Sequence, residues 1–518
     1  MKTLNKLRVI ACLLCLFTGV IVTESHGEEP LFNKKIVVFH EWVLWGEVQE
    51  YADEWEEAGV SVITELPLIN GLVLKVPAFI TSSELRADPR VLGVEENQKV
   101  RIQGVLHYGG LGFFSRKDKA AEPTHSVVQP VPKPPSYHRP WGVLRLYNQL
   151  RHPDTPTGSF DHWRVPKVIK KAWWHMALRQ KLRVAILDTG ADASHPDLSR
   201  VLKGGFDVTT MTPGVPRDDN GHGTHIAGTI LSVIGSAEFW AAPPVDLFAV
   251  KILDRYTYGD LYNIVLGLQW AVRHGMDVVN MSLSYRDDSL AVRLAIKKAY
   301  EAGLILVAAA GNHSNWDAPP LGAAVFVGAA DGGAADGGAA DGGAADGGAA
   351  DGGAADGGAA DGGAADGGAA DGGAADGGAG GGTQGAIPRY SVMYPARYLE
   401  VISVGASTPF RSMASFSNSG PDLDVTAPGT GIVSAALSKG RWRAHEFAIC
   451  SGTSMATAHV TAAVVFMLAI DPQLSGQEIR ELLWETADGL RNYDGAGDLN
   501  LIKALESLLS SSGPGNRR

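Results

Sequence analysis

Three short segments of the sequence carry side chains that can perform nucleophilic catalysis. Asp188 is followed by Thr-Gly, His222 lies in the glycine-rich run 220–228 (NGHGTHIAG), and Ser454 lies in the run 451–459 (SGTSMATAH). A serine hydroxyl is a poor nucleophile until a base takes its proton, and an imidazole can do this near neutral pH. A carboxylate on the other ring nitrogen would stabilise the imidazolium that forms. Together these residue types predict a Ser-His-Asp triad.

Two of the motifs have other interpretations when each is taken alone. Asp-Thr-Gly also marks aspartic proteases, but that class needs a second such motif, in the same chain or across a dimer, and the sequence contains no second copy. His222 and His225 could be a metal pair or a satisfied pair in the core. The H-E-x-x-H pattern of metalloproteases is absent. The Gly-Thr-Ser-Met-Ala run before an apolar helix is the most specific signal of the three.

The elements around these segments predict a parallel sheet. Short apolar runs without polar alternation occur at 184–187, 247–250, 278–281 and 304–307. Such runs are typical of parallel strands covered on both faces. Helical patterns separate them, near 223–234, 261–274 and 289–302. The sequence therefore predicts an α/β fold with a doubly wound, mainly parallel sheet whose sites lie at the carboxyl ends of strands.

The candidate residues stand where such a sheet would collect them. Asp188 directly follows the first apolar run, and the runs that hold His222 and Ser454 each open a helix. A helix start places backbone N–H groups beside negative charge that develops at Ser454. The glycines around both runs let the backbone approach closely.

In the order Asp, His, Ser, these motifs resemble the subtilisin-like serine proteases. The resemblance runs from about Trp141 or Trp163 to Leu501, and further motifs support it at 247–253, 280–283, 308–312, 415–421 and 427–429. It implies a peptidase domain over 141–508, with Asn312 and the Ser454 backbone N–H as oxyanion hole. It also implies a substrate groove built from Ser282, Leu283, Ser284, Tyr285, Ala309 and Gly311. No cofactor is required by this chemistry.

Two positions depart from the family pattern. Ser284-Tyr285 stand where the family often has two glycines, so the Tyr285 side chain either restricts the pocket or points to solvent. Asp197 matches a calcium ligand of many subtilisins, but the companion Asn-rich loop is missing, so a strong calcium site is not expected there and any metal ligands stay unknown.

Residues 33–100 predict a separate small domain. Strand and helix patterns follow one another as β-α-β-β-α-β, a ferredoxin-like order, with a capping box at 81–84. The motifs at 69–72 and 94–97 resemble the inhibitory propeptide of the same family. The proline-rich stretch 101–140 predicts an extended, accessible linker that holds the processing site.

The N-terminus predicts a signal peptide over 1–25. Three basic residues precede the apolar run 9–22, which is too short to favour a membrane span, and the cleavage position is placed after Ser25. An uncleaved anchor and a lipoprotein box at Cys12 are the alternatives. The mature chain is expected to be secreted or periplasmic, without stable membrane insertion.

Composition excludes several other classes. The net charge is −11, but ten Ala-Ala-Asp-Gly-Gly repeats at 329–378 supply ten Asp, which leaves a net charge of −11 + 10 = −1 for the rest. No basic field for nucleic acid remains. The insertion 329–382 has no large apolar side chain and predicts a solvated loop. Of the three cysteines, Cys450 alone remains after signal removal, as a reactive or a buried thiol, while Met455 beside the nucleophile predicts oxidant sensitivity.

The sequence as a whole predicts an exported, self-processing, monomeric serine endopeptidase that acts on proteins or peptides and is first inhibited by its own propeptide. Three rivals stay open. They are an inactive, binding-type homologue, an aspartic protease centred on Asp188, and an interaction protein whose function lies in the repeat.

Overall fold

The computed structural model describes residues 32–102, 105–107, 141–146, 166–178, 180–235, 245–312, 391–437, 447–491 and 493–511. The predicted signal peptide, linker residues 108–140 and the 329–382 insertion lie outside the described residues.

A ten-stranded sheet forms the centre of the larger, C-terminal domain, in the order β19-β20-β16-β15-β14-β12-β7-β10-β8-β9. Its central strands are parallel: β8 (Leu202–Asp207), β10 (Val245–Lys251), β7 (Leu182–Asp188), β12 (Val278–Met281), β14 (Ile305–Ala309), β15 (Val401–Ser407) and β16 (Val425–Pro428). Antiparallel pairs close both edges of the sheet. At one edge β8 pairs with β9 (Thr212–Pro213), and at the other edge β19 (Asp488–Leu490) pairs with β20 (Tyr493–Asp498). This confirms the predicted doubly wound, mainly parallel α/β sheet.

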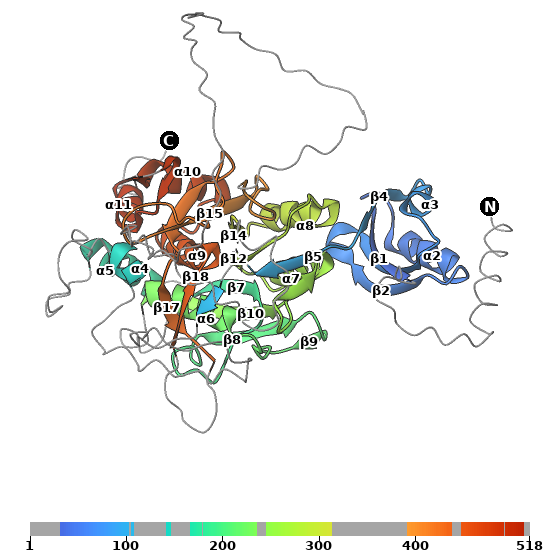
Figure 1. Ribbon diagram of the computed structural model, residues 1–518, viewed down its shortest axis with the longest axis horizontal. Coiled ribbons are helices and arrows are strands. Elements are labelled where there is room, and N and C mark those ends of the chain that lie inside the picture. The colour runs from blue at the N-terminus through green and yellow to red at the C-terminus, as the bar shows by residue number, and fades with distance from the viewer. Residues whose placement is uncertain are drawn as a thin grey trace, which may run out of the picture. The chain divides into compact units, whose positions relative to one another are not determined.

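Helices cover both faces of the sheet (Figure 1). Alternate residues of β7 enter opposite cores: Val184 and Ile186 pack in one cluster, Ala185 and Leu187 in the other. The first cluster includes α5 (Lys167–Leu178), α6 (His222–Ile234), α9 (Thr453–Ile470), α10 (Gly476–Thr486), α11 (Leu501–Ser511) and the short α4 (Trp141–Leu146). The second includes α7 (Leu261–Arg273) and α8 (Leu290–Glu301). Burial on both faces explains why these strands are continuous apolar runs.

Helix α9 is the central helix of the first cluster. Its 18 residues are all buried, with a mean hydropathy of 1.7, so it has the length and composition of a membrane span but is packed inside the protein. A helix that is apolar on all sides is typical of such a core position.

The N-terminal domain has the predicted order. It consists of β1 (Phe32–Phe39), α2 (Trp45–Glu56), β2 (Ser61–Leu66), the 3₁₀ turn η1 (Pro67–Ile69), β3 (Gly71–Pro77), α3 (Ser82–Arg86) and β4 (Val91–Glu96). The strands form one sheet in the order β2-β3-β1-β4, and α2 covers a core of its own around Tyr51. Thr81 caps α3 through the predicted capping box.

The prediction of an accessible linker from residue 101 is wrong for its first residues. Strand β5 (Lys99–Ile102) pairs antiparallel with both β11 (Tyr258–Asp260) and β13 (Leu283–Ser284). Strand β6 (Val105–His107) pairs with β18 (Phe447–Ser451), which in turn pairs with β17 (Ile432–Ala435). Sheet edges satisfy the backbone groups of an extended segment, and Val100 and Ile102 bury their side chains in the second core cluster.

Two buried histidines make the stability of the fold depend on pH. His225 Nε2 lies 3.1 Å from the carbonyl oxygen of Ile432, and His459 Nδ1 lies 2.8 Å from that of Met455. Burial lowers the pKa of His225 to about 3 and that of His459 to about 4. Both residues are therefore neutral in the folded protein, whereas an unfolded histidine takes up a proton below about pH 6.5.

Because only the unfolded chain binds these protons, the free energy of unfolding should fall as the pH drops from about 6.5 to 5. The expected slope is about 1.4 kcal/mol per pH unit for each histidine. Denaturant unfolding of the Ser454→Ala chain at several pH values measures this slope without self-digestion. His459→Gln should reduce the slope by about half. An unaltered slope in His459→Gln would contradict this account.

Candidate active site

The carboxyl ends of neighbouring strands collect most of the candidate residues. Asp188 ends β7, Ser282 directly follows β12, and Asn312 lies shortly after β14. These three strands are adjacent and parallel, so their carboxyl ends meet at one edge of the sheet. His222 and Ser454 lie in the first turns of α6 and α9.

Asp188 and His222 form a buried pair. His222 Nδ1 lies 2.8 and 2.9 Å from the two carboxylate oxygens of Asp188, and each side chain is 1% exposed. The Asp188 Oδ1 also accepts a hydrogen bond from the Thr189 N–H at 2.8 Å. His222 Nε2 is buried and has no hydrogen-bond partner among the described residues. Because Nδ1 donates to the carboxylate, Nε2 carries the lone pair and can accept a proton or a hydrogen bond.

Ser454 is fully buried beneath the segment that enters β13. Its hydroxyl donates to the Ser282 carbonyl oxygen at 3.0 Å, and the Ser282 hydroxyl donates to the Ser454 carbonyl oxygen at 3.1 Å. Two reciprocal bonds thus fix the start of α9 against the strand that the sequence assigned to the substrate groove. The structure thus brings together Ser454 and Ser282, two of the candidate site residues.

Asn312 is held by the residue that precedes Ser454. Its Oδ1 accepts from the Thr453 N–H at 3.1 Å and from the Thr453 hydroxyl at 3.0 Å. These donors fix which end of the Asn312 amide is the acceptor. Gly311 is required beside it, because its φ is +107° and an added Cβ would lie 2.7 Å from Asn418 Nδ2.

Asp218 is a site residue that the sequence analysis missed. Its carboxylate accepts from the backbone N–H groups of Gly221 and Thr224 and from the Thr189 hydroxyl, at 2.8 to 2.9 Å. It therefore ties the turn after β7 to the turn that opens α6, and so positions Asp188 against His222. An Asp shortly before a glycine-rich turn is an ordinary pattern, so the sequence held no signal for this role.

The N-terminal chain crosses this edge of the sheet. Within β5, Ile102 lies opposite Leu283 and Arg101 opposite Ser284, while Val105 of β6 lies opposite Ser451, three residues before Ser454. The described chain thus lies on the Ser282 side of Ser454 at residues 101–102 and on the Ser451 side from residue 105.

The Tyr285 side chain takes a position that the sequence analysis did not expect. It is fully buried, its hydroxyl lies 3.0 Å from the Tyr398 hydroxyl, and its ring stacks on Tyr394 at 5.9 Å. Of the two alternatives for Tyr285, the solvent-facing side chain is wrong. The tyrosine joins β13 to the segment 394–398, because a buried hydroxyl must find a partner and Tyr398 supplies one.

Tyr285→Gly should therefore destabilise the protein. Loss of a large buried aromatic side chain costs about 3–5 kcal/mol, most of it from the cavity left behind. The unfolding temperature of the Ser454→Ala chain, with and without the second substitution, measures this. An unchanged unfolding temperature together with broader acceptance of large residues before the cut would show that Tyr285 lines the pocket instead.

Met393 is a second residue that the sequence analysis missed. Its Sδ lies 3.4 Å from the Ser284 hydroxyl oxygen and would lie 2.8 Å from a Cβ at Gly311. It thus lies between the two segments assigned to the groove, while Ala309 is buried within β14. Nothing in the local sequence around Met393 points to this place, since the contact joins segments far apart in the chain.

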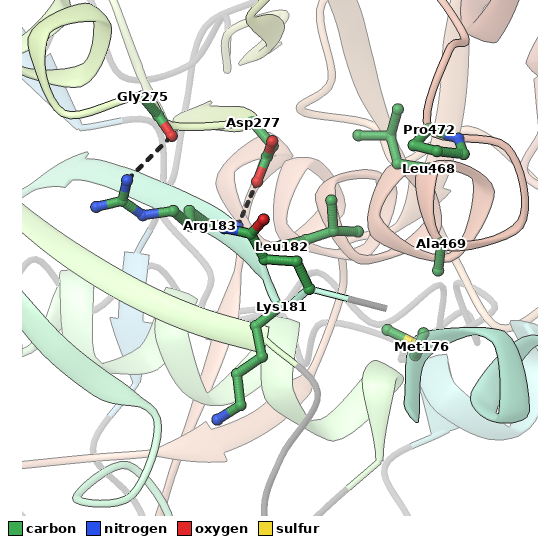
Figure 2. A pocket seen from close by; sticks show the side chains of 10 residues that line it. Met176, Lys181, Leu182, Arg183, Gly275, Asp277, Leu468, Ala469 and Pro472 are labelled. Carbon is green, nitrogen blue, oxygen red and sulfur yellow. Dashed lines mark hydrogen bonds between the residues drawn. The ribbon is translucent and has the colours of Figure 1, made fainter. Parts of the chain in front are cut away.

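One cavity in the described part of the chain lies away from these residues. It has a volume of about 370 Å³, and the side chains of Met176, Leu182 and Leu468 contribute to its lining (Figure 2). Leu182 begins β7 at the edge opposite to Asp188. Leu468 is 14 residues beyond Ser454 on α9, which places it about 21 Å away along the helix. This cavity is therefore separate from the candidate site.

Two further expectations concern metals and sulfur. Within the described residues, no group of three or more His, Cys, Asp or Glu side chains is placed to hold a metal ion. Cys450 and Met455 are both fully buried, which favours the inert alternative for the thiol.

Comparison with known proteins is consistent with this geometry. The sequence model of the subtilase family matches residues 179–502. Subtilisin E of Bacillus subtilis is 31% identical over 486 residues, which cover 93% of each chain. A thermostable alkaline protease of Halalkalibacterium halodurans is 31% identical over 440 residues, covering 85% of this chain and 82% of the relative.

Among solved structures, the chain is similar in fold to fervidolysin from Fervidobacterium pennivorans, described as a keratinolytic enzyme related to subtilisin. The TM-score is 0.59 at 20% identity, and the match covers 93% of this chain but 62% of that one. Since the family match spans most of the described peptidase region, the protein belongs to the subtilase family and is a subtilisin-like serine endopeptidase.

Proposed function

We propose that Asp188, His222 and Ser454 are the catalytic triad of this endopeptidase. The buried carboxylate on His222 Nδ1 is the observation that carries the proposal, because it leaves Nε2 to act as the base. The Ser454 hydroxyl leaves the Ser282 carbonyl oxygen and turns to Nε2, which takes its proton as Oγ attacks the substrate carbonyl carbon. Nε2 then gives this proton to the leaving amine, and water hydrolyses the acyl-enzyme by the same steps.

Asn312 and the Ser454 backbone N–H donate to the oxygen that becomes negative in the tetrahedral intermediate. The Asn312 oxygen is engaged by Thr453, so the opposite end of the same amide is the donor. Ser282, Leu283, Ser284, Ala309 and Gly311 line the substrate groove, with Met393 between its two walls. No cofactor takes part in these steps.

The N-terminal domain acts as an intramolecular inhibitor. Glu95 accepts from the Ser289 hydroxyl at 2.7 Å and from the Leu290 N–H at 2.9 Å, at the start of α8. Lys298 of α8 forms an ion pair with Glu41 at 2.7 Å. Strand β5 occupies the position of a bound substrate between β11 and β13, which keeps other peptides out.

Self-cleavage then falls within residues 102–105. Only the three peptide bonds between Ile102 and Val105 bridge the two strands that flank Ser454. Expression of the chain with Ser454 intact and as Ser454→Ala, followed by intact-mass analysis, tests both the nucleophile and this junction. The parent should yield a mature N-terminus at residue 103, 104 or 105, and the variant should stay uncut. Normal processing of purified Ser454→Ala would contradict the proposal.

Glu95→Ala should release the inhibitor sooner. Burial raises the pKa of Glu95, and the helix-terminal donors oppose this rise, so removal of the carboxylate leaves these donors unpaired. Charge-assisted bonds of this kind contribute about 1.5–3 kcal/mol, which corresponds to a shortening of the lag before full activity by roughly 10- to 150-fold. Peptidase activity followed after self-cleavage measures the lag. Glu50→Ala, on the exposed side of α2, is the matched control, and an equal lag in both variants would refute the role of Glu95.

Export of the protein and its monomeric state are part of the same proposal. The predicted signal peptide supports export, as does a 29% identical relative over 325 residues, the minor extracellular protease Epr of Bacillus subtilis. We infer a mature, monomeric enzyme outside the cytoplasm that cleaves protein or peptide substrates.

A further inference from the structure

Asp260 is an acidic residue at the end of β11 whose cationic and amide partners come from the N-terminal segment, while the Tyr262 side chain of α7 also interacts with it. Its carboxylate, with 9% of the side chain exposed, contacts Lys34 Nζ at 2.9 Å, Lys99 Nζ at 2.5 Å and Asn97 Nδ2 at 3.0 Å. Burial alone would raise the pKa of Asp260, but these three donors lower it to about 2. In the precursor the residue is therefore a fixed negative charge at the end of β11.

The contact with Lys99 comes from the strand that fills the groove. Lys99 lies directly opposite Asp260 in the β5–β11 register, and β5 continues through Ile102 toward Ser454. A substrate bound in the same antiparallel register would present a side chain at the place of Lys99. Because the cleaved bond lies between residues 102 and 105, this side chain belongs to the fourth, fifth or sixth residue before the cut.

Asp260 is not needed to hold its own helix. It is the residue before α7, yet its side chain forms no capping hydrogen bond. When the N-terminal segment leaves, Lys34, Asn97 and Lys99 leave together, and the carboxylate loses all three of these donors. A carboxylate at the rim of a groove, without a cation beside it, favours a substrate that brings one.

We propose that Asp260 is a specificity-determining residue that makes the mature enzyme prefer Lys or Arg at the substrate position held by Lys99 in the precursor. The inference rests on the proposed function, in which β5 occupies the substrate groove. It predicts a substrate preference that is set by charge several residues away from the cleaved bond. This preference does not depend on the groove residues around Met393.

Three peptides with the sequence of residues 97–107 test this inference. They carry Lys, norleucine or Glu at position 99, so they share one cleavage site and differ in charge at similar length. The self-processed enzyme should cleave them in the order Lys, norleucine, Glu. The Lys-to-norleucine ratio of kcat/KM should be about 2–5, the range for a partly exposed ion pair, and should fall as salt rises from 20 to 500 mM.

Asp260→Asn should bring this ratio to about one. Asp246→Asn is the matched control. Asp246 lies near the amino end of β10, away from the carboxyl ends of the strands where the site lies, and it pairs with Lys181, so the ratio should stay at the parent value. If Asp260→Asn does not process itself, Asp260→Ser is used in its place. If neither variant processes itself, the order in which the parent enzyme cleaves the three peptides decides whether the inference holds. Equal cleavage of Lys and norleucine peptides by the parent, or an unchanged ratio in Asp260→Asn, would overturn the inference. Failure of the self-processed parent to cleave any of the three would instead count against the proposed function.

Discussion

Replacement of Ser454 by alanine should lower kcat for peptide hydrolysis by about 10⁶, the magnitude measured on subtilisin itself. The physical reason is that the acyl-enzyme route is lost completely, while binding and the oxyanion donors remain. Single-turnover hydrolysis by Ser454→Ala and parent enzyme, both freed of the N-terminal domain by the same added protease, measures the difference.

The matched substitutions show whether the three residues act as one unit. His222→Ala should lose as much as Ser454→Ala, and the double variant should be no slower, because a nucleophile without its base and a base without its nucleophile are equally useless. Asp188→Asn should lose less, on the order of 10⁴, again as measured on subtilisin. Acid-optimum activity that survives Ser454→Ala would instead identify an aspartic protease centred on Asp188.

Asn312→Ala should lower kcat by roughly 10²–10³ with little change in KM. This range was also measured on subtilisin, for the loss of one oxyanion-hole donor. The donor acts mainly on the charge that develops in the transition state, so ground-state binding is nearly unaffected. Steady-state kinetics on a single peptide separates the two parameters.

Two further variants interpret the Asn312 result. Thr453→Val removes one of the two donors that orient the Asn312 amide and should give a smaller loss of kcat, about tenfold. Asn500→Ala, at the start of α11, should change neither parameter. A normal kcat in Asn312→Ala, or a loss confined to KM, would remove Asn312 from the oxyanion hole.

Much of the fold could be predicted because its signals are local. Strand β7 and its neighbours are apolar runs that need both faces covered, and α6 and α9 begin at glycine-rich turns. Asp188 was placed correctly because it directly ends such a strand. The domain before residue 97 was predicted for the same reason, since its capping box and turns are set within a few residues.

The features that could not be predicted depend on contacts between distant segments. The pairing of β5 with β11 and β13 joins residues more than 150 positions apart, and in the sequence residues 99–107 are merely the start of a proline-rich stretch. The burial of Tyr285 depends on Tyr398 in the same way. Nothing in the local sequence around Asp260 indicates that Lys34, Asn97 and Lys99 contact it, because all three lie more than 150 residues away.

The most direct test of the triad is covalent labelling of the self-processed enzyme with a fluorophosphonate, followed by peptide mapping. Such a reagent reacts only with a serine whose hydroxyl is activated by a base, so it reports the chemistry of one side chain rather than overall activity. We predict one adduct, on Ser454, and its loss in His222→Ala. An enzyme that hydrolyses peptides but stays unlabelled, or one labelled at another residue, would contradict the assignment of Ser454 as the nucleophile.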